Sequence, residues 1–186
     1  MKLYIKDMVC NRCITVVKQE LEKLHLDPIR VGLGEVELIE PASDKELLQL
    51  NERLKIFGFE LLDTQKQKQV EKIKILLIKK VQAGEIEEHF MMSGFLSKAL
   101  NKDYSYLSSL FSHVESVTIE QFFILQKIEK VKELLVYDEL NLSEISFKLG
   151  YSSVAHLSAQ FKKVTGLTPT HFKKKGHKYR KSLDKV

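Results

Sequence analysis

Hydrophobic and polar positions alternate in the first residues of the chain and then take up a helical period. Residues 2–6 (KLYIK) alternate in the way that is typical of a half-buried strand. Further along, apolar residues recur at the spacing of one helix face, at Ile14, Val17, Leu21 and Leu24. The pattern therefore predicts a strand followed by a helix.

Two strands, a helix and a last strand are predicted next. Pro28 ends the first helix, and the two strands carry alternating apolar residues at Ile29, Val31, Leu33, Val36 and Leu38. Ser43 and Glu46 have the spacing of a capping box, in which the hydroxyl and the carboxylate satisfy free amides at a helix start. The apolar positions of that helix are Leu47, Leu48, Leu50, Leu54 and Phe57. Residues 59–62 (FELL) close the series as a strand. Residues 1–65 are thus predicted to be an α+β domain of ferredoxin-like order, βαββαβ.

The rest of the chain, residues 66–186, has a purely helical pattern. The polar stretch at residues 63–69 (DTQKQKQ) predicts a connector, and a helical stripe follows it from Val70 to Val81. Thr118 and Gln121 form a second capping box at the start of a long helix. We therefore expect an all-α second domain.

A helix, a glycine turn and a second helix follow one another near the C-terminus. The first helix covers residues 144–149, Gly150 makes the turn, and Leu157, Phe161 and Val164 are expected to face inward from the second. This order predicts a helix-turn-helix unit. Thr168 and Pro169 open one more helix, as a cap followed by proline at the first helical position.

Composition excludes several classes of protein. Of the 186 residues, 44% are hydrophobic and 30% are charged, which is typical of a globular protein. No apolar run approaches the ~20 residues that a bilayer span requires, so no membrane partner is expected. The first ten residues lack the apolar core of a signal peptide, and we expect a cytoplasmic protein.

Charge divides the chain in the same place as the pattern. Residues 1–65 hold 9 Lys and Arg against 12 Asp and Glu, whereas residues 66–186 hold 21 against 13. Such a split is consistent with a basic module that faces nucleic acid or anionic lipid, and equally with a solvated lysine-rich surface.

The two cysteines of the chain, Cys10 and Cys13, stand two residues apart in the segment DMVCNRC. This spacing fits a redox couple, half of a zinc site or a clamp for a soft metal. Two soft thiolates at a helix start suit Cu(I), whereas structural zinc usually takes four ligands. Lys6 and Arg12 flank the loop and could offset the charge of a dithiolate, and Met8 is expected to plug the core beneath it.

The first domain resembles the heavy-metal-associated domain of copper chaperones and copper-pumping ATPases. The match covers roughly residues 1–63 and rests on Met8, Cys10 and Cys13 in an M-x-C-x-x-C loop and on Gly58 and Phe59 before the last strand. The resemblance implies that Cys10 and Cys13 bind Cu(I) or another soft metal, and that a copper-handling protein is a candidate partner.

The second domain resembles the DNA-binding domain of AraC/XylS transcription regulators over about residues 70–175. The matching features are the block LSEISFKLGYSS, Leu157, Phe161, Lys162, Gly166 and Thr168-Pro169, together with Tyr106-Leu107-Ser108 and Leu110-Phe111 in an upstream unit. The resemblance implies two recognition helices that bind double-stranded DNA in adjacent segments of the major groove.

The resemblance also implies candidate DNA contacts. In the first recognition helix they are Tyr104, Ser105, Ser108, Ser109 and Ser112, and in the second Ser152, Ser153, Ala155, His156 and Ala159. Neither helix contains Arg, the usual reader of guanine, so hydroxyls, His156, methyl contacts and DNA shape are expected to carry recognition. The alternative for His156 is an ordinary solvated residue. Candidate phosphate contacts are Lys162, Lys163, Lys173, Lys174 and Lys175, together with Lys178, Arg180 and Lys181 in a basic tail. The alternative for the tail is a solvated terminus that does not contact DNA.

No constellation of residues resembles a catalytic site, so we do not expect an enzyme. The favoured hypothesis is a transcription regulator of AraC type that responds to a soft metal through its CxxC loop. In one alternative the first domain serves only for interaction or dimerisation. In another, the chain is a copper chaperone or redox protein with an accessory helical domain.

Overall fold

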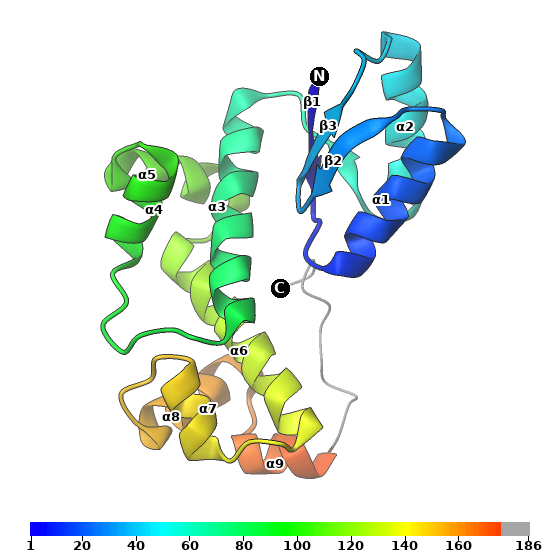
Figure 1. Cartoon of the computed structure of the whole chain (residues 1–186). Helices are drawn as coiled ribbons and strands as arrows, with labels where there is room; N and C mark the ends of the chain where they lie inside the picture. The colour runs from blue at the N-terminus through cyan, green and yellow to red at the C-terminus, as the bar shows by residue number, and fades with distance from the viewer. Residues whose placement is uncertain (176–186) are drawn as a thin grey trace. The chain divides into compact units, whose positions relative to one another are not determined.

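The computed structural model of the chain describes residues 1–175, which belong to two compact units (Figure 1). The units are Met1–Ile75 and Leu76–Val186, and they divide within one helix, α3 (Gln65–Ala83). The boundary expected from the sequence, 65/66, lies at the start of this helix. The first half of α3 therefore belongs to the first unit. Within residues 1–175, no helix has the length and apolar character that a bilayer span requires.

The first unit contains a four-stranded sheet and two helices that precede α3. The elements are β1 (Lys2–Lys6), α1 (Asn11–Lys23), β2 (Pro28–Gly32), β3 (Glu35–Leu38), α2 (Asp44–Ile56) and β4 (Glu60–Leu61). The strands lie in the order β2-β3-β1-β4, and each is antiparallel to its neighbours. This element order is the predicted βαββαβ.

The two faces of β1 are covered differently. Leu3 and Ile5 point into the core that α1 and α2 close on one side of the sheet (Figure 1). Tyr4 points to the other side, where the ammonium groups of Lys68 and Lys72 on α3 lie 5.5 and 4.9 Å from its ring centre. The sheet is thus packed on both faces within the first unit.

Several apolar residues that were expected inside are exposed. Ile29 is 64% exposed because the register between β2 and β3 shifts between Pro28 and Arg30 and breaks the alternation. Leu48 and Phe57 are also exposed, since only one face of α2 meets the core. In the second unit, Val164 is likewise exposed rather than inward.

Helix α3 begins earlier than the sequence pattern indicated. The predicted polar connector is mostly its first turns, because Thr64 caps the helix. The Thr64 hydroxyl accepts a hydrogen bond from the main-chain N–H of Gln67 at 3.2 Å. The same hydroxyl donates to the side-chain oxygen of Gln67 at 2.8 Å. The Gln and Lys residues that looked like a linker are good helix formers.

The second unit contains two helix-turn-helix pairs joined by a long helix. Its elements after α3 are α4 (Met92–Leu100), α5 (Tyr104–Glu115), α6 (Ile119–Tyr137), α7 (Leu142–Lys148), α8 (Val154–Thr165) and α9 (Pro169–Lys175). The capping boxes predicted at Ser43 and Thr118 are both present. A third, unpredicted box at Asn141 and Glu144 opens α7.

Helix α6 is shared by both pairs (Figure 1). Edge-to-face packing of Phe111 against Phe122 joins α5 to α6, with ring centres 5.6 Å apart. A similar contact of Phe161 with Phe172, at 5.5 Å, joins α8 to α9. Helices α5 and α8 therefore each have their own aromatic anchor within the second unit.

Candidate nucleic-acid interface and metal site

The residues predicted to contact bases from the second recognition helix are all exposed, on α8 itself or in the two residues before it. Leu157 and Phe161 are fully buried on the opposite face. The exposed residues are Ser152, Ser153, Ala155, His156 and Ala159. The helix is therefore anchored on one side and presents small polar and apolar groups on the other.

Short-range contacts fix the first turn of α8. Ser153 is the N-cap, and its hydroxyl accepts a hydrogen bond from the main-chain N–H of His156 at 3.0 Å. The Ser152 hydroxyl lies 3.1 Å from Nδ1 of the His156 ring. The same ring stands edge-to-face with Tyr151, with centres 5.3 Å apart. These contacts restrict the orientation of the exposed His156 ring.

The residues assigned to α5 are less uniformly exposed. Ser105 and Ser109 are exposed, and Tyr104, Ser108 and Ser112 are half-buried. The Tyr104 hydroxyl donates a short hydrogen bond to the carboxylate of Glu120 at the start of α6. Burial and this bond raise the pKa of Tyr104, and the same bond lowers the pKa of Glu120. Tyr104 therefore links α5 to α6 through a hydrogen bond, and its side chain is only partly exposed.

Tyr106 of α5, which was named only as part of the family resemblance and not as a DNA contact, is 51% exposed. It stands three residues after the N-cap Asp103, as His156 stands three residues after the N-cap Ser153. Aligning the two helices from their caps would have identified it. Two buried residues were also missed, Lys127 on α6 and Tyr151 before α8.

The candidate phosphate contacts lie at the ends of α8 and α9. Lys162, Lys163 and Lys174 are exposed. Lys173 is exposed too but forms an ion pair with Asp138 at the end of α6. The side chain of Lys175 and the tail residues Lys178, Arg180 and Lys181 lie outside the described residues.

The two cysteines lie together at the start of α1, in the first unit. Cys10 is the N-cap of the helix, and its Sγ lies 3.4 Å from Sγ of Cys13. Both are free, half-buried thiols. Burial raises the pKa of Cys10, but the N–H and thiol of Cys13, together with Arg12, lower it below its ordinary value overall. Burial is the main reason that the pKa of Cys13 is raised.

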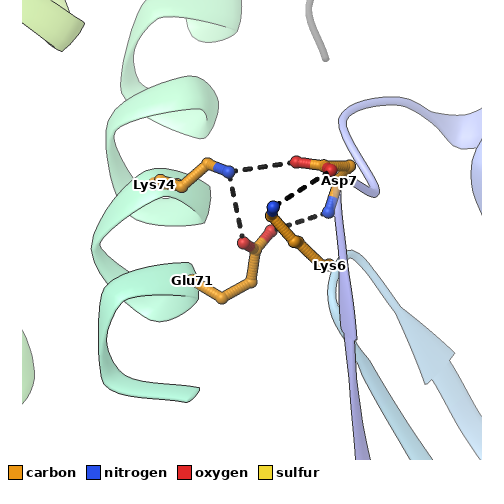
Figure 2. A network of polar contacts seen from close by, with 4 residues as sticks. All are labelled: Lys6, Asp7, Glu71 and Lys74. Carbon is orange, nitrogen blue, oxygen red and sulfur yellow. Dashed lines mark hydrogen bonds and ion pairs between the residues drawn. The ribbon is translucent and has the colours of Figure 1, made fainter. Parts of the chain in front are cut away.

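The loop that leads to the cysteines is tied to α3 by a network of charged residues (Figure 2). Lys74 donates to the carboxylate of Asp7 at 3.0 Å and lies 3.4 Å from the carboxylate of Glu71. Glu71 in turn accepts a hydrogen bond from the main-chain N–H of Asp7 at 3.2 Å, while Lys6 lies 3.9 Å from Asp7. Asp7 has a left-handed backbone, φ 66°, a conformation that Asp tolerates better than most residues. The network fixes the chain three residues before Cys10.

The donor set fits a soft ion held by two sulfurs. Within residues 1–175, no group of three or more His, Cys, Asp and Glu side chains is placed to hold a metal. Met8 is fully buried in the core, as expected of a plug. Two neighbouring thiols without carboxylate or imidazole are suited to Cu(I) rather than to a four-ligand structural zinc site.

Comparison with known proteins supports the reading of the second unit. Residues 96–175 match a family model described as a helix-turn-helix domain. The chain is 29% identical to the Msm operon regulatory protein of Streptococcus mutans over 79 residues. The matched segment covers 42% of this chain and 28% of that protein. It therefore spans less than a third of the length of this curated relative.

Solved structures with similar folds include domains of response regulators. The C-terminal domain of AraT, a response regulator from Geobacillus stearothermophilus, superposes with a TM-score of 0.51 at 21% identity, over 63% of this chain and 95% of that one. The C-terminal domain of the response regulator yesN from Fusobacterium nucleatum is 26% identical over 55% of this chain and 98% of its own, with a TM-score of 0.47. The family match and the fold of α4 to α9 agree. Residues 96–175 form a helix-turn-helix domain.

Proposed function

We propose that the chain is a DNA-binding transcription regulator that places α5 and α8 in the major groove of duplex DNA. The observation that supports this most directly is the two-sidedness of α8, with buried Leu157 and Phe161 opposite a row of exposed candidate readers. A helix-turn-helix pair docks by placing the exposed face of its second helix against base edges. The match of residues 96–175 to a helix-turn-helix family model supports the same function.

Lysines at the ends of the helices supply the electrostatic part of binding. Lys162 and Lys163 lie in the last turn of α8, where they are exposed and can reach phosphates on either side of the groove. Each phosphate contact contributes a slope of about −0.9 to log affinity against log salt. Binding is therefore expected to weaken steeply with salt.

The test is a salt titration of the full chain on genomic DNA fragments. Replacing Lys162 and Lys163 with Gln should reduce the salt slope by ~1–2 and weaken binding to all fragments alike. The matched control replaces Lys45 and Lys55, two exposed lysines of α2 in the first unit, and should leave the slope unchanged. Binding that no fragment supports, or that is indifferent to salt, would exclude this function.

We further propose that the first unit is a heavy-metal-associated domain of ferredoxin-like fold that binds one soft monovalent ion such as Cu(I). Cys10 and Cys13 would hold the ion as thiolates. Their sulfurs are already 3.4 Å apart, and Cys10 lies at the positive end of the α1 dipole. When bound, such an ion fixes both sulfurs in one geometry. A copper-handling protein is the proposed donor.

A route for coupling the ion to DNA binding runs through α3. Asp7, three residues before Cys10, is joined to Glu71 and Lys74 of α3 (Figure 2), and this helix continues past Ile75 into the second unit. A change in the loop would then act on a helix that both units share. Allosteric coupling is typically ~1–3 kcal/mol, or roughly 5- to 150-fold in affinity, and it is reciprocal.

Two assays separate the steps of this proposal. Competition with a Cu(I) chelator should show binding that Cys10→Ser and Cys13→Ser each abolish. DNA affinity should then differ between the apo and Cu(I)-loaded chain, and Asp7→Asn should reduce that difference without removing the ion. Asp27→Asn, at an exposed position of the same unit, is the control. Equal DNA affinity in every state would instead favour an interaction or dimerisation role for the first unit.

A further inference from the structure

The ring of Tyr151 connects α6 to the first turn of α8. Tyr151 is buried and directly follows the Gly150 turn. Its hydroxyl donates to the side-chain oxygen of Gln160 at 2.8 Å, and its ring stands edge-to-face with His156, with the ring planes 86° apart. The tyrosine therefore contacts α8 at two points, one of which is a candidate reader of DNA.

A buried lysine lies over the same ring. The ammonium of Lys127, a residue of α6 that is 8% exposed, lies 3.8 Å from the ring centre of Tyr151. Within the described part of the chain, no ion pair involves Lys127. A buried ammonium without an anion is costly, and a cation–π contact of this kind offsets part of that cost. The ring of Tyr151 is thus held by Lys127 from α6 while it supports His156.

The orientation of His156 is restricted from a second direction. Nδ1 faces the Ser152 hydroxyl at 3.1 Å, so Nε2 is the ring nitrogen that remains for a ligand. When the hydroxyl donates to Nδ1, Nε2 carries the hydrogen; when Nδ1 donates to the hydroxyl instead, Nε2 is an acceptor. In the first arrangement His156 offers a hydrogen-bond donor from the exposed face of α8, and this is the arrangement that the inference uses.

We infer that Lys127 and Tyr151 are positioning residues that preorganise His156 to donate a hydrogen bond to a purine in the major groove. This inference rests on the proposed DNA-binding function. The N-terminal residues of a recognition helix contact base edges, and His156 is the third residue of α8. In that groove N7 is an acceptor on both purines, with O6 as a second acceptor on guanine. His156 replaces, at this helix, the arginine that the two recognition helices lack.

The first experiment identifies the base pair that His156 reads. Full-length wild-type chain and His156→Ala are each used to select binding sites from a random duplex library. The wild type should show a preference at one base pair that the variant has lost. Both should bind unselected DNA within about 2-fold of one another, since phosphate contacts supply most non-specific affinity.

A chemical probe then tests the acceptor. The purine of that base pair is replaced by its 7-deaza analogue, which lacks the N7 acceptor. Wild-type affinity should fall about 5- to 10-fold, as expected for one hydrogen bond of ~1 kcal/mol. The affinity of His156→Ala should not change. A wild type that is indifferent to 7-deaza substitution, or a preference that survives in His156→Ala, would overturn the assignment.

The positioning role is tested with the same probe. The 7-deaza ratio is the affinity for the unmodified site divided by the affinity for the 7-deaza site. Tyr151→Phe keeps the ring and loses only the bond to Gln160, so the ratio should be retained. Tyr151→Leu and Lys127→Met should bring the ratio towards one while binding to unselected DNA is kept. Lys98→Met, an exposed position of α4, is the control. A purely structural role predicts instead that all binding falls together with thermal stability.

The outcomes also separate this inference from the proposed function. If the wild type binds no DNA, the DNA-binding proposal itself fails. If Tyr151→Leu does not fold, Lys127→Met with the 7-deaza probe still decides the matter. A full 7-deaza effect in a folded Lys127→Met chain would show that Lys127 does not position His156.

Discussion

Helices α5 and α8 begin in the same way but present different side chains. Counted from their N-caps, Asp103 and Ser153, the third residues are Tyr106 in α5 and His156 in α8. The cap of α8 is engaged in a side-chain hydrogen bond, whereas Asp103 makes none. The position that holds exposed Ser109 in α5 holds exposed Ala159 in α8.

A tyrosine at or near the start of each helix also has different partners. Tyr104 of α5 bonds to an anion, Glu120, whereas Tyr151 next to α8 lies against a cation, Lys127. The first contact attaches a helix to its neighbour, and the second also supports an exposed ring. The difference indicates that a repeated fold motif does not imply a shared recognition task. We expect α8 to read bases and α5 to contribute hydroxyl contacts and shape readout.

The largest expected effect comes from adding an acidic side chain to each helix at matched positions. Ala155→Glu and Ser105→Glu both alter the exposed second residue of a helix, where a carboxylate favours the fold. Like-charge contact costs several kcal/mol, so Ala155→Glu should weaken DNA binding by roughly 100-fold. Ser105→Glu should cost about 10-fold, because we expect α5 to contribute hydroxyl contacts and shape readout rather than base reading. Titration of a selected site measures both, and the opposite order would break the comparison.

The turns before the two helices should respond unequally to alanine. Gly150 has φ 64°, and a Cβ there would lie 2.7 Å from the carbonyl oxygen of Glu87 and 2.8 Å from that of Ile86. Left-handed strain and overpacking together should lower the free energy of unfolding by about 3 kcal/mol in Gly150→Ala. Asn101, the left-handed residue in the turn before α5 with φ 50°, is less confined, so Asn101→Ala should lower the free energy of unfolding by only about 1 kcal/mol. Urea denaturation measures both values, and similar losses would mean that Gly150 is not specially confined.

The buried cation beneath α8 should give stability a pH dependence. Burial lowers the pKa of Lys127 to about 8, below the ordinary value of 10.5 that applies to the unfolded chain. Between these values the unfolded state binds more protons than the folded state, so this residue makes stability rise with pH from about 8 to 10.5. Below pH 8 its burial penalty is constant.

Lys127→Met should remove this dependence. At pH 7 the variant should be more stable than the wild type by about 3 kcal/mol, and the advantage should shrink towards pH 10. Urea denaturation at several pH values gives the slope, with Lys98→Met as the control. If the advantage does not change with pH, Lys127 is not buried as a charged group.

Local signals explain what could be predicted from the sequence. The order βαββαβ, the capping boxes at Ser43 and Thr118 and the Cys10–Cys13 pair depend on residues a few positions apart. An exposed Leu48 or Val164 could not be foreseen, because an apolar residue only adds to the count of a helix face. Which face meets the core is decided by neighbouring elements.

The contacts that organise the two sites are non-local and left no sequence pattern. Asp7 and Lys74 are 67 residues apart along the chain, and Lys127 reaches Tyr151 only because α6 packs against the turn before α8. A lone lysine in a helix or a tyrosine after a glycine has many ordinary roles. The start of α3, in contrast, was readable from Thr64 and Gln67, whose spacing is that of a capping pair.

The smallest expected effect separates the two caps. Ser153→Ala removes the acceptor for the N–H of His156 and should lower the free energy of unfolding by about 1 kcal/mol. Asp103→Ala removes no side-chain cap bond, so its loss should come from the helix dipole alone, ~0.3–0.5 kcal/mol. Dipole effects are screened by salt and a hydrogen bond to a neutral hydroxyl is not. In 1 M NaCl the Asp103→Ala loss should therefore vanish while the Ser153→Ala loss remains. Because the cap also orders the turn that carries His156, Ser153→Ala should lower the 7-deaza ratio of the wild type, and Asp103→Ala should not. Equal behaviour of the two variants in both assays would mean that the first turns of α5 and α8 are organised alike.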